Sequence, residues 1–231
     1  MGWFRRVYFA WDTINLEDVT PDINSISQLL HSDDRLLRLE GEIKLNYFLI
    51  QIQIGPSDYA ASANRRAKEF WTDIFTIVLD ILKENDYHSR YEAAWCITYA
   101  GYSLADIIPH SLIPSIVEKL TALWIERRTF DGRINWAIYA CLIPGMQITD
   151  SPELRVAIDR SLQSPDGEER LTAVCLGILN HQLSGQQVRN HLREIPDYFR
   201  RTRFLRELGY VDEDGHILDE HGNIIPEDDE E

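Results

Sequence analysis

Hydrophobic residues recur at helical spacing along most of this chain, and short polar turns divide the pattern into paired segments. In the first pair, Ile23, Ile26 and Leu30 fall three or four residues apart, a polar turn follows at 31–34, and a second apolar segment begins at Arg35. Residues at this spacing share one face of an α-helix, whereas a strand would alternate every second residue. The pattern therefore predicts amphipathic helices in pairs.

The same arrangement recurs along the chain, with Pro, Asp and Ser at the turns where helices begin. The predicted pairs are 22–30 with 35–52, 65–83 with 89–102, 112–127 with 133–143, 151–163 with 168–182, and a terminal pair of 185–193 with 197–208. The small polar stretch 56–64 is expected to close the first pair rather than to form a helix. We therefore expect an all-α fold of about four to five antiparallel helical pairs.

An arginine after an acidic turn marks the second helix of each pair. These arginines are Arg38, Arg90, Arg133 and Arg170. An aspartate precedes each of them, at Asp34, Asp86, Asp131 and Asp166. An aspartate at a helix start can accept hydrogen bonds from the first free amides, and the arginine of one pair can reach the acidic turn of the next. We therefore expect both contacts in the folded chain.

This pattern of helical pairs, an Asp-containing turn, an arginine and an Ala-rich second helix resembles the HEAT-repeat family. The likeness is clearest at 86–101 and 166–179 and extends over roughly 22–182. It implies a right-handed stack of helical pairs, an α-solenoid, whose members are mostly scaffolds and binding adaptors and whose motif contains no catalytic residue. The unequal spacing of the arginines and the scarcity of turn prolines leave an irregular helical bundle as the alternative fold.

Composition supports a folded chain with an acidic end. Of the 231 residues 44% are hydrophobic, which is enough for a substantial core. The formal net charge is −15, but 212–231 contains ten of the 38 acidic residues and none of the 23 basic ones, so the rest is only mildly acidic. We expect a single helical-repeat domain at 1–211 and an acidic tail at 212–231, either flexible or folded as a small docked hairpin.

The tail resembles a calcium-binding loop only in part. The segment 212–217 is similar to the middle of an EF-hand loop, but alignment on Gly215 places Tyr210 and His221 at the first and last ligand positions. Both strong ligands are then missing, so we do not expect calcium there. No histidine pair has metal-ligand spacing elsewhere, and we expect no metal and no cofactor.

Aromatic residues on the second helices are the candidates for partner binding. Those residues are Trp95, Tyr99, Tyr102, Trp136 and Tyr139, and the first pair could extend the same surface with Tyr47 and Lys44. Spacings of three and four place the aromatics in stripes, and Trp and Tyr dominate binding hot spots when they are exposed. The alternative is that these rings belong to the core, and that the polar side of the first pair is merely solvated.

Basic residues gather near the C-terminus of the predicted helical domain. They are Arg189, Arg193, Arg200, Arg201, Arg203 and Arg206. One interpretation is a contact with phosphate or with an acidic protein. The interpretation we favour is a terminal helical pair whose arginines offset the acidic tail that follows, because that tail can reach back to them.

The sequence contains no recognisable catalytic constellation. Cys96, Cys141 and Cys175 lie in apolar helical patterns and behave as small hydrophobic residues of a reducing compartment. There is no glycine-rich phosphate loop and no nucleophile elbow, and no apolar run is long enough to span a membrane or to form a secretory core.

We therefore expect a non-enzymatic, cytoplasmic protein-binding module. It would act as an adaptor, or as an inhibitor of the immunity-protein type, and its acidic surface favours a basic protein partner over nucleic acid. The alternatives are a HEAT-like enzyme acting on DNA, of the base-excision glycosylase type, and a HEAT-like pigment lyase. The first needs a basic groove, and the predicted second helices lack a stripe of Lys and Arg.

Overall fold

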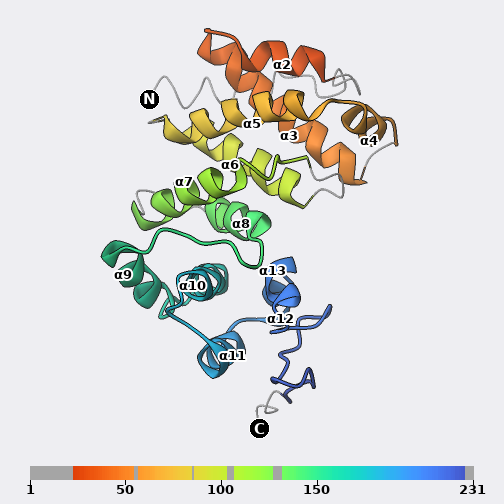
Figure 1. Ribbon diagram of the computed structural model, residues 1–231. Helices are drawn as coiled ribbons and strands as arrows, with labels where there is room; N and C mark the ends of the chain where they lie inside the picture. The colour runs from red at the N-terminus through yellow and green to blue at the C-terminus, as the bar shows by residue number, and fades with distance from the viewer. Residues whose placement is uncertain (1–22, 55–56, 85, 103–106, 127–131, 227–231) are drawn as a thin grey trace. The chain divides into compact units, whose positions relative to one another are not determined.

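The structure, a computed structural model, describes residues 23–54, 57–84, 86–102, 107–126 and 132–226 (Figure 1). These residues form twelve helices and only isolated β-bridges, so the all-α prediction is confirmed. The chain divides into two compact units, Met1–Ile113 and Pro114–Glu231, called unit 1 and unit 2 below. Within the described residues, no helix is both long enough and apolar enough to cross a bilayer.

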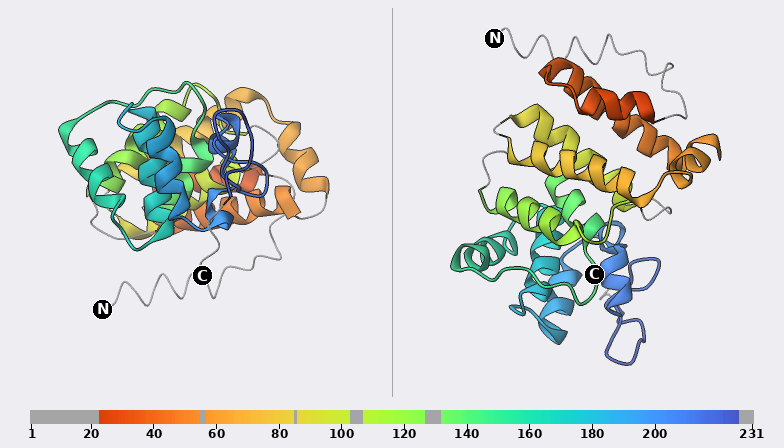
Figure 2. Two further views of the ribbon diagram at one scale, coloured as in Figure 1. Left: turned by 90° about the horizontal axis from the view of Figure 1, so that it is seen from below. Right: turned by 45° about the horizontal axis from the view of Figure 1, so that its top comes forward.

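Unit 1 is built around its longest helix. Its helices are α2 (Asn24–Leu30), α3 (Arg35–Ile54), α4 (Ser57–Asn64), α5 (Lys68–Lys83) and α6 (Tyr87–Gly101). Helix α3 packs against α2, α4 and α6, and α5 packs against α6, as the orange and yellow ribbons of Figures 1 and 2 show. Helix α2 approaches α3 closely at Gly41, where an added Cβ would lie 2.9 Å from the backbone nitrogen of Leu30.

The expectation that 56–64 would form no helix is wrong, because Ser57–Asn64 is helix α4. Three alanines give this segment a high helix propensity, and Ala63 and Ser62 are buried. Its small residues suggested a loop, but they allow α4 to pack closely against α3. The polarity of 56–64 could not distinguish a loop from a helix, because small side chains occur both in turns and where helices pack closely.

The expected aspartate caps are present at three second helices. In each, the side chain of the aspartate accepts a hydrogen bond from a first-turn amide. The pairs are Asp34 with Leu36 (2.8 Å), Asp86 with Ser89 (3.3 Å) and Asp166 with Glu168 (2.9 Å). The fourth aspartate, Asp131, lies outside the described residues. The acidic turns therefore satisfy donors that the helices themselves leave unpaired.

The expected contact from an arginine to the next turn is present for two of the four arginines, Arg38 and Arg170. Arg38 of α3 lies 3.0 Å from the carboxylate of Glu84, in the turn before α6, and Arg35 lies 2.7 Å from Asp86 in the same turn. In unit 2, Arg170 of the second helix donates to the backbone carbonyl of Glu194, just after the following helix. Each arginine thus joins two successive helical segments of its own unit.

Unit 2 is arranged around one central, mostly buried helix. Its helices are α7 (Ile113–Glu126), α8 (Gly132–Cys141), α9 (Pro152–Ser161), α10 (Gly167–Leu179), α11 (Gly185–Arg193), α12 (Asp197–Arg200) and α13 (Arg203–Glu207). Helix α10 packs against α8, α9, α11 and α12. The predicted helix 197–208 is instead two short helices, because Thr202 caps a new start by accepting from the amide of Leu205 (3.3 Å).

The segment after α13 folds into two successive tight hairpins. Val211 bridges Ile217, and Leu218 bridges Ile224, both in antiparallel fashion. Matching backbone hydrogen bonds close the two turns, from Asp212 N to His216 O (3.0 Å) and from Asp219 N to Asn223 O (2.8 Å). Residues 212–226, the described part of the predicted tail, are therefore largely ordered and contribute Ile217, which is 1% exposed, to the core.

Candidate partner-binding surface

Helix α6 has one small, buried side and one aromatic side. Ala93, Cys96 and Ala100 are at most 2% exposed, and they form the flat side that faces the rest of unit 1. Trp95 and Tyr99 are half-buried, and their rings stack with centroids 4.9 Å apart and planes only 10° apart. The two rings therefore lie face to face and form one packed aromatic pair that is partly open to solvent.

Tyr102 continues the aromatic side at the C-cap of α6, where it is 44% exposed. Trp95, Tyr99 and Tyr102 together are called the aromatic face. They follow one another at spacings of four and three residues, so they lie along one stripe of the helix and its cap. Three of the predicted partner-binding residues are therefore partly or largely exposed together on a single element.

Helix α3 supports the aromatic face by running parallel to α6. Asn46 donates from Nδ2 to Glu92 Oε2 (2.7 Å), and Gln53 donates from Nε2 to the backbone oxygen of Tyr99 (2.7 Å). Both bonds join residues 46 positions apart, so the two helices advance in the same direction and in register. Gln53 is exposed, and its amide nitrogen is held against α6, which leaves its amide oxygen as an acceptor beside the aromatic face.

The two candidate residues of α3 are less accessible. Lys44 pairs with Glu40 at 2.7 Å, one helical turn away, and 21% of its side chain is exposed. Tyr47 is half-buried and lies near enough to Tyr59 for the two phenols to interact electrostatically. These residues lie on the helix that packs against α6, but the contacts that position the aromatic face come from Asn46 and Gln53.

The two aromatic candidates of unit 2 differ sharply in exposure. Trp136 is 37% exposed, and its indole N–H bonds the carboxylate of Glu168. Tyr139, one turn further along α8, is only 6% exposed and belongs to the core. Its ring lies 6.4 Å from that of Trp136. Tyr139 is therefore too buried to anchor a partner.

A cluster of buried polar groups lies behind the aromatic face, between α3 and α6. Glu42 is fully buried and Glu92 is 3% exposed. Neither carboxyl oxygen of Glu42 has a hydrogen-bond partner among the described residues, whereas Glu92 accepts from Asn46. Sequence reasoning missed this cluster, although Glu42 and Asn46 are polar residues among the apolar positions of α3 and could have signalled it.

Burial of these carboxyl groups changes their protonation. It raises the pKa of Glu42 to about 9, and the nearby charge of Glu92 adds to the effect. Burial, followed by the charge of Glu92, also raises the pKa of the Tyr99 phenol. Glu42 is therefore neutral at pH 7, and the electrostatic influence of Glu92 extends to the aromatic face.

The cysteines do not supply a nucleophile. Cys96, Cys141 and Cys175 are all buried, and burial raises the pKa of each thiol, that of Cys141 to about 12. A thiol reacts as its thiolate, which such burial suppresses. In the part of the chain that the structure describes, no three His, Cys, Asp or Glu side chains gather in a way that could hold a metal ion.

The arginines near the C-terminus of unit 2 hold the hairpins in place. Arg189 donates from Nε to the backbone oxygen of Leu218 (2.6 Å), and its guanidinium lies 5.4 Å from the ring centroid of Tyr210. Arg201 donates from Nε to the backbone oxygen of Asp214 (2.9 Å). Two of the six arginines therefore bind the backbone of the acidic tail, as the favoured interpretation of this basic stretch expects.

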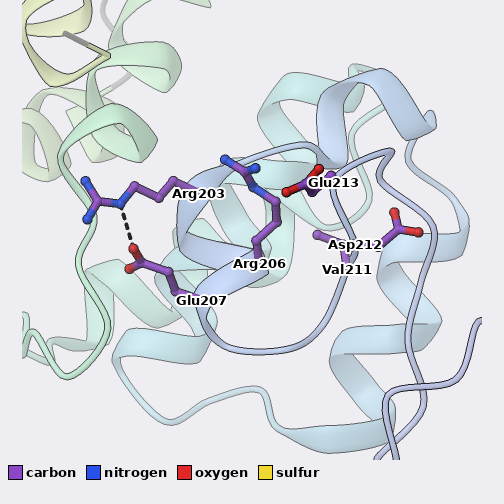
Figure 3. Close-up of a pocket in the computed structure, with 6 residues that line it drawn as sticks. All are labelled: Arg203, Arg206, Glu207, Val211, Asp212 and Glu213. Carbon is purple, nitrogen blue, oxygen red and sulfur yellow. Dashed lines mark hydrogen bonds and ion pairs between the residues drawn. The ribbon is translucent and has the colours of Figure 1, made fainter. Parts of the chain in front are cut away.

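The same end of unit 2 has an open pocket of about 540 Å³, lined by Arg203, Arg206, Glu207, Val211, Asp212 and Glu213 (Figure 3). Figure 3 shows Arg203 turned toward Glu207, and the two side chains are 2.6 Å apart. Asp212 is bound by His216 at 2.8 Å. Because the lining combines both signs of charge and much of it is already paired, the pocket does not favour a strongly charged ligand.

Comparisons with models of protein families, with curated proteins and with solved structures find no match for this chain.

Proposed function

We propose that this protein is a non-enzymatic protein-binding module that holds a partner protein at the aromatic face of unit 1. The observation that carries the proposal is the half-buried, parallel stack of Trp95 and Tyr99 beside the exposed Tyr102. Tryptophan and tyrosine anchor interfaces because they bury a large area at little cost in side-chain entropy. A rigid, preformed stack lowers that cost further.

The contacts within unit 1 support a HEAT-like stack as the architecture behind this face. The second helix of one pair, α3, runs parallel to the second helix of the next, α6, and α2 contacts α5. Arg38 joins the same two pairs across an offset of 46 residues. Such parallel second helices are what a solenoid of four to five helical pairs would use as a continuous binding surface.

Charge supports a basic partner. The net charge of −15, to which the ten acidic residues of 212–231 contribute most, would attract a positively charged protein over long range. The three basic side chains of α3 are already neutralised, Arg35 by Asp86, Arg38 by Glu84 and Lys44 by Glu40. An adaptor, or a cytoplasmic inhibitor of a basic protein, fits these features equally.

The proposal is tested by affinity capture from the cells that express the protein. Wild type is compared with a Trp95→Ala/Tyr99→Ala variant, and Tyr198→Ala is the control, since Tyr198 is 61% exposed but lies in unit 2. We expect a partner that is captured by wild type and by the control and lost from the double variant. Equal capture by all three, with circular dichroism showing each to be folded, would contradict the assignment of the face.

A further inference from the structure

We infer that the aromatic face recognises an arginine side chain of the basic partner, with the guanidinium stacked on the outer ring face of the Trp95–Tyr99 pair and attracted by Glu92 behind it. This inference rests on the proposed function and specifies the group that the face binds.

The geometry of the rings favours a flat cation. The Trp95 and Tyr99 planes lie within 10° of each other and their centroids are 4.9 Å apart, so the rings are stacked face to face and the outer side of the stack is a flat ring face. A guanidinium is planar and weakly hydrated, and it stacks on aromatic rings through both dispersion and cation–π attraction. The ammonium of lysine is compact and strongly hydrated, so it would gain less from the same surface.

A buried carboxyl group lies behind this surface. Glu92 precedes Trp95 by less than one helical turn and is 3% exposed, and Asn46 holds its carboxylate at 2.7 Å. Glu92 also contributes, after burial, to the raised pKa of the Tyr99 phenol. A carboxylate in a poorly solvated site is screened less than one at the surface, so it would attract a cation above the rings more strongly.

A hydrogen-bond acceptor lies next to the backbone of Tyr99. The amide nitrogen of Gln53 is bound to the backbone oxygen of Tyr99, and this orients the amide so that its oxygen can accept from a second donor. A guanidinium has five N–H groups directed outward in its plane. One of these N–H groups could donate to the amide oxygen of Gln53 while the guanidinium stacks on the aromatic pair. That hydrogen bond would fix the orientation of the guanidinium.

The experiment measures binding of three peptides to the full chain by isothermal titration calorimetry at 150 mM salt. The probes are octa-arginine, octa-lysine and octa-glutamate. We expect octa-arginine to bind at least ten-fold more tightly than octa-lysine, and octa-glutamate not to bind. Equal affinity for the arginine and lysine peptides would overturn the inference, because the acidic tail alone would produce that result.

Variants of the protein locate the binding. We expect Trp95→Leu to weaken octa-arginine binding at least ten-fold, Glu92→Gln to weaken it several-fold, and Tyr198→Leu to leave it within two-fold. Trp95→Phe keeps an aromatic ring and should retain part of the affinity, which separates a lost platform from a lost fold. Octa-arginine binding that is unchanged in Trp95→Leu would overturn the inference. If affinity capture still depends on Trp95 and Tyr99 in that case, the proposed function stands without the arginine assignment.

Discussion

At the scale of single residues, burial decides the chemistry of the unit 1 interior. Glu42 is enclosed between α3 and α6 with neither carboxyl oxygen hydrogen-bonded by the described residues, and its pKa is raised to about 9. The groups facing it include Glu92 of α6 and Arg38 of its own helix. Desolvation outweighs the attraction of Arg38, so the carboxyl group is held in its neutral form.

Glu42 should make the stability of the protein depend on pH. The folded state keeps a proton that the unfolded state releases above pH 4.5, so stability falls as the pH rises from about 4.5 to about 9. At pH 7 the loss is on the order of 3 kcal/mol. We expect Glu42→Gln to be more stable than wild type by roughly this amount at pH 7, and less so at pH 5.

Urea unfolding at pH 5 and pH 8 measures this effect. Glu40→Gln is the matched control, because Glu40 lies on the same helix but is half-buried and paired with Lys44. Wild type and the control should both lose stability between the two pH values, while Glu42→Gln should lose much less. Parallel curves for wild type and Glu42→Gln would show that Glu42 is ionised in the folded protein.

At the scale of elements, aspartate caps and glycine turns determine where segments start and end. Asp166 accepts from the amides of Glu168 (2.9 Å) and Glu169 (3.0 Å) at the start of α10, the helix around which unit 2 packs. The cap stabilises the helical form of α10, and the packing contacts of α10 with its neighbours form only when it is helical. Loss of this cap should therefore be felt by the whole unit.

We expect Asp166→Ala to lower the free energy of unfolding by about 1–2 kcal/mol, the usual cost of losing a cap. Asp166→Asn is the control, because asparagine also caps well and should lose much less. Thermal or urea unfolding measures both. A similar loss in the two variants would indicate that the negative charge of Asp166 matters more than its hydrogen bonds.

The two hairpins after α13 form a seven-residue repeat that sequence reasoning missed. The segments 211–217 and 218–224 share Asp, Glu, Gly and Ile at equivalent positions, and their glycines, Gly215 and Gly222, have φ of +87° and +82°. The first two copies have Asp212 and Asp219 at their second position, and the backbone amide of each aspartate donates a hydrogen bond that closes the hairpin. The third copy would have Pro226 at this position. Proline has no amide hydrogen to donate, so the repeat ends there. The local sequence thus encodes both the turns and their end.

The two glycines should respond differently to the same substitution. A Cβ at Gly215 would overlap the backbone oxygen of Asp197, whereas nothing lies within 4 Å of one at Gly222. We expect Gly222→Ala to cost roughly 1 kcal/mol for the left-handed backbone alone. Gly215→Ala should cost about 3 kcal/mol, because it adds an overlap to the same strain. Comparison of their melting temperatures measures the difference.

At the scale of the whole molecule, charge and aromatic contact should act on different steps of binding. Under the proposed function, the net charge of −15 would accelerate encounter with a basic partner, and the aromatic face would hold the partner after contact. Both units contain their own buried core, and the face belongs to unit 1 alone. The steps can therefore be separated by kinetics.

We expect the association rate constant of the captured partner to fall at least ten-fold between 50 and 500 mM salt, with a smaller change in dissociation. Trp95→Ala should instead accelerate dissociation and leave association nearly unchanged. Surface plasmon resonance measures both constants. An association rate that does not depend on salt would argue against a basic partner.

The sequence by itself determined the helical segments, their aspartate caps and the arginines that join successive turns. These features depend on residues close together in the chain, or on one charged group meeting a turn of opposite charge, so spacing and residue type reveal them. The short helix α4 escaped because its small residues suit both a turn and a packed helix.

Only the tertiary structure decided which side chains are buried. Trp136 and Tyr139 are aromatic neighbours on one helix, yet one is 37% exposed and the other 6%. The burial of Glu42 and the docking of the hairpins through Arg189 likewise depend on elements distant in the chain. Periodicity shows that a helix has two sides, but the position of its neighbours determines which of them meets solvent.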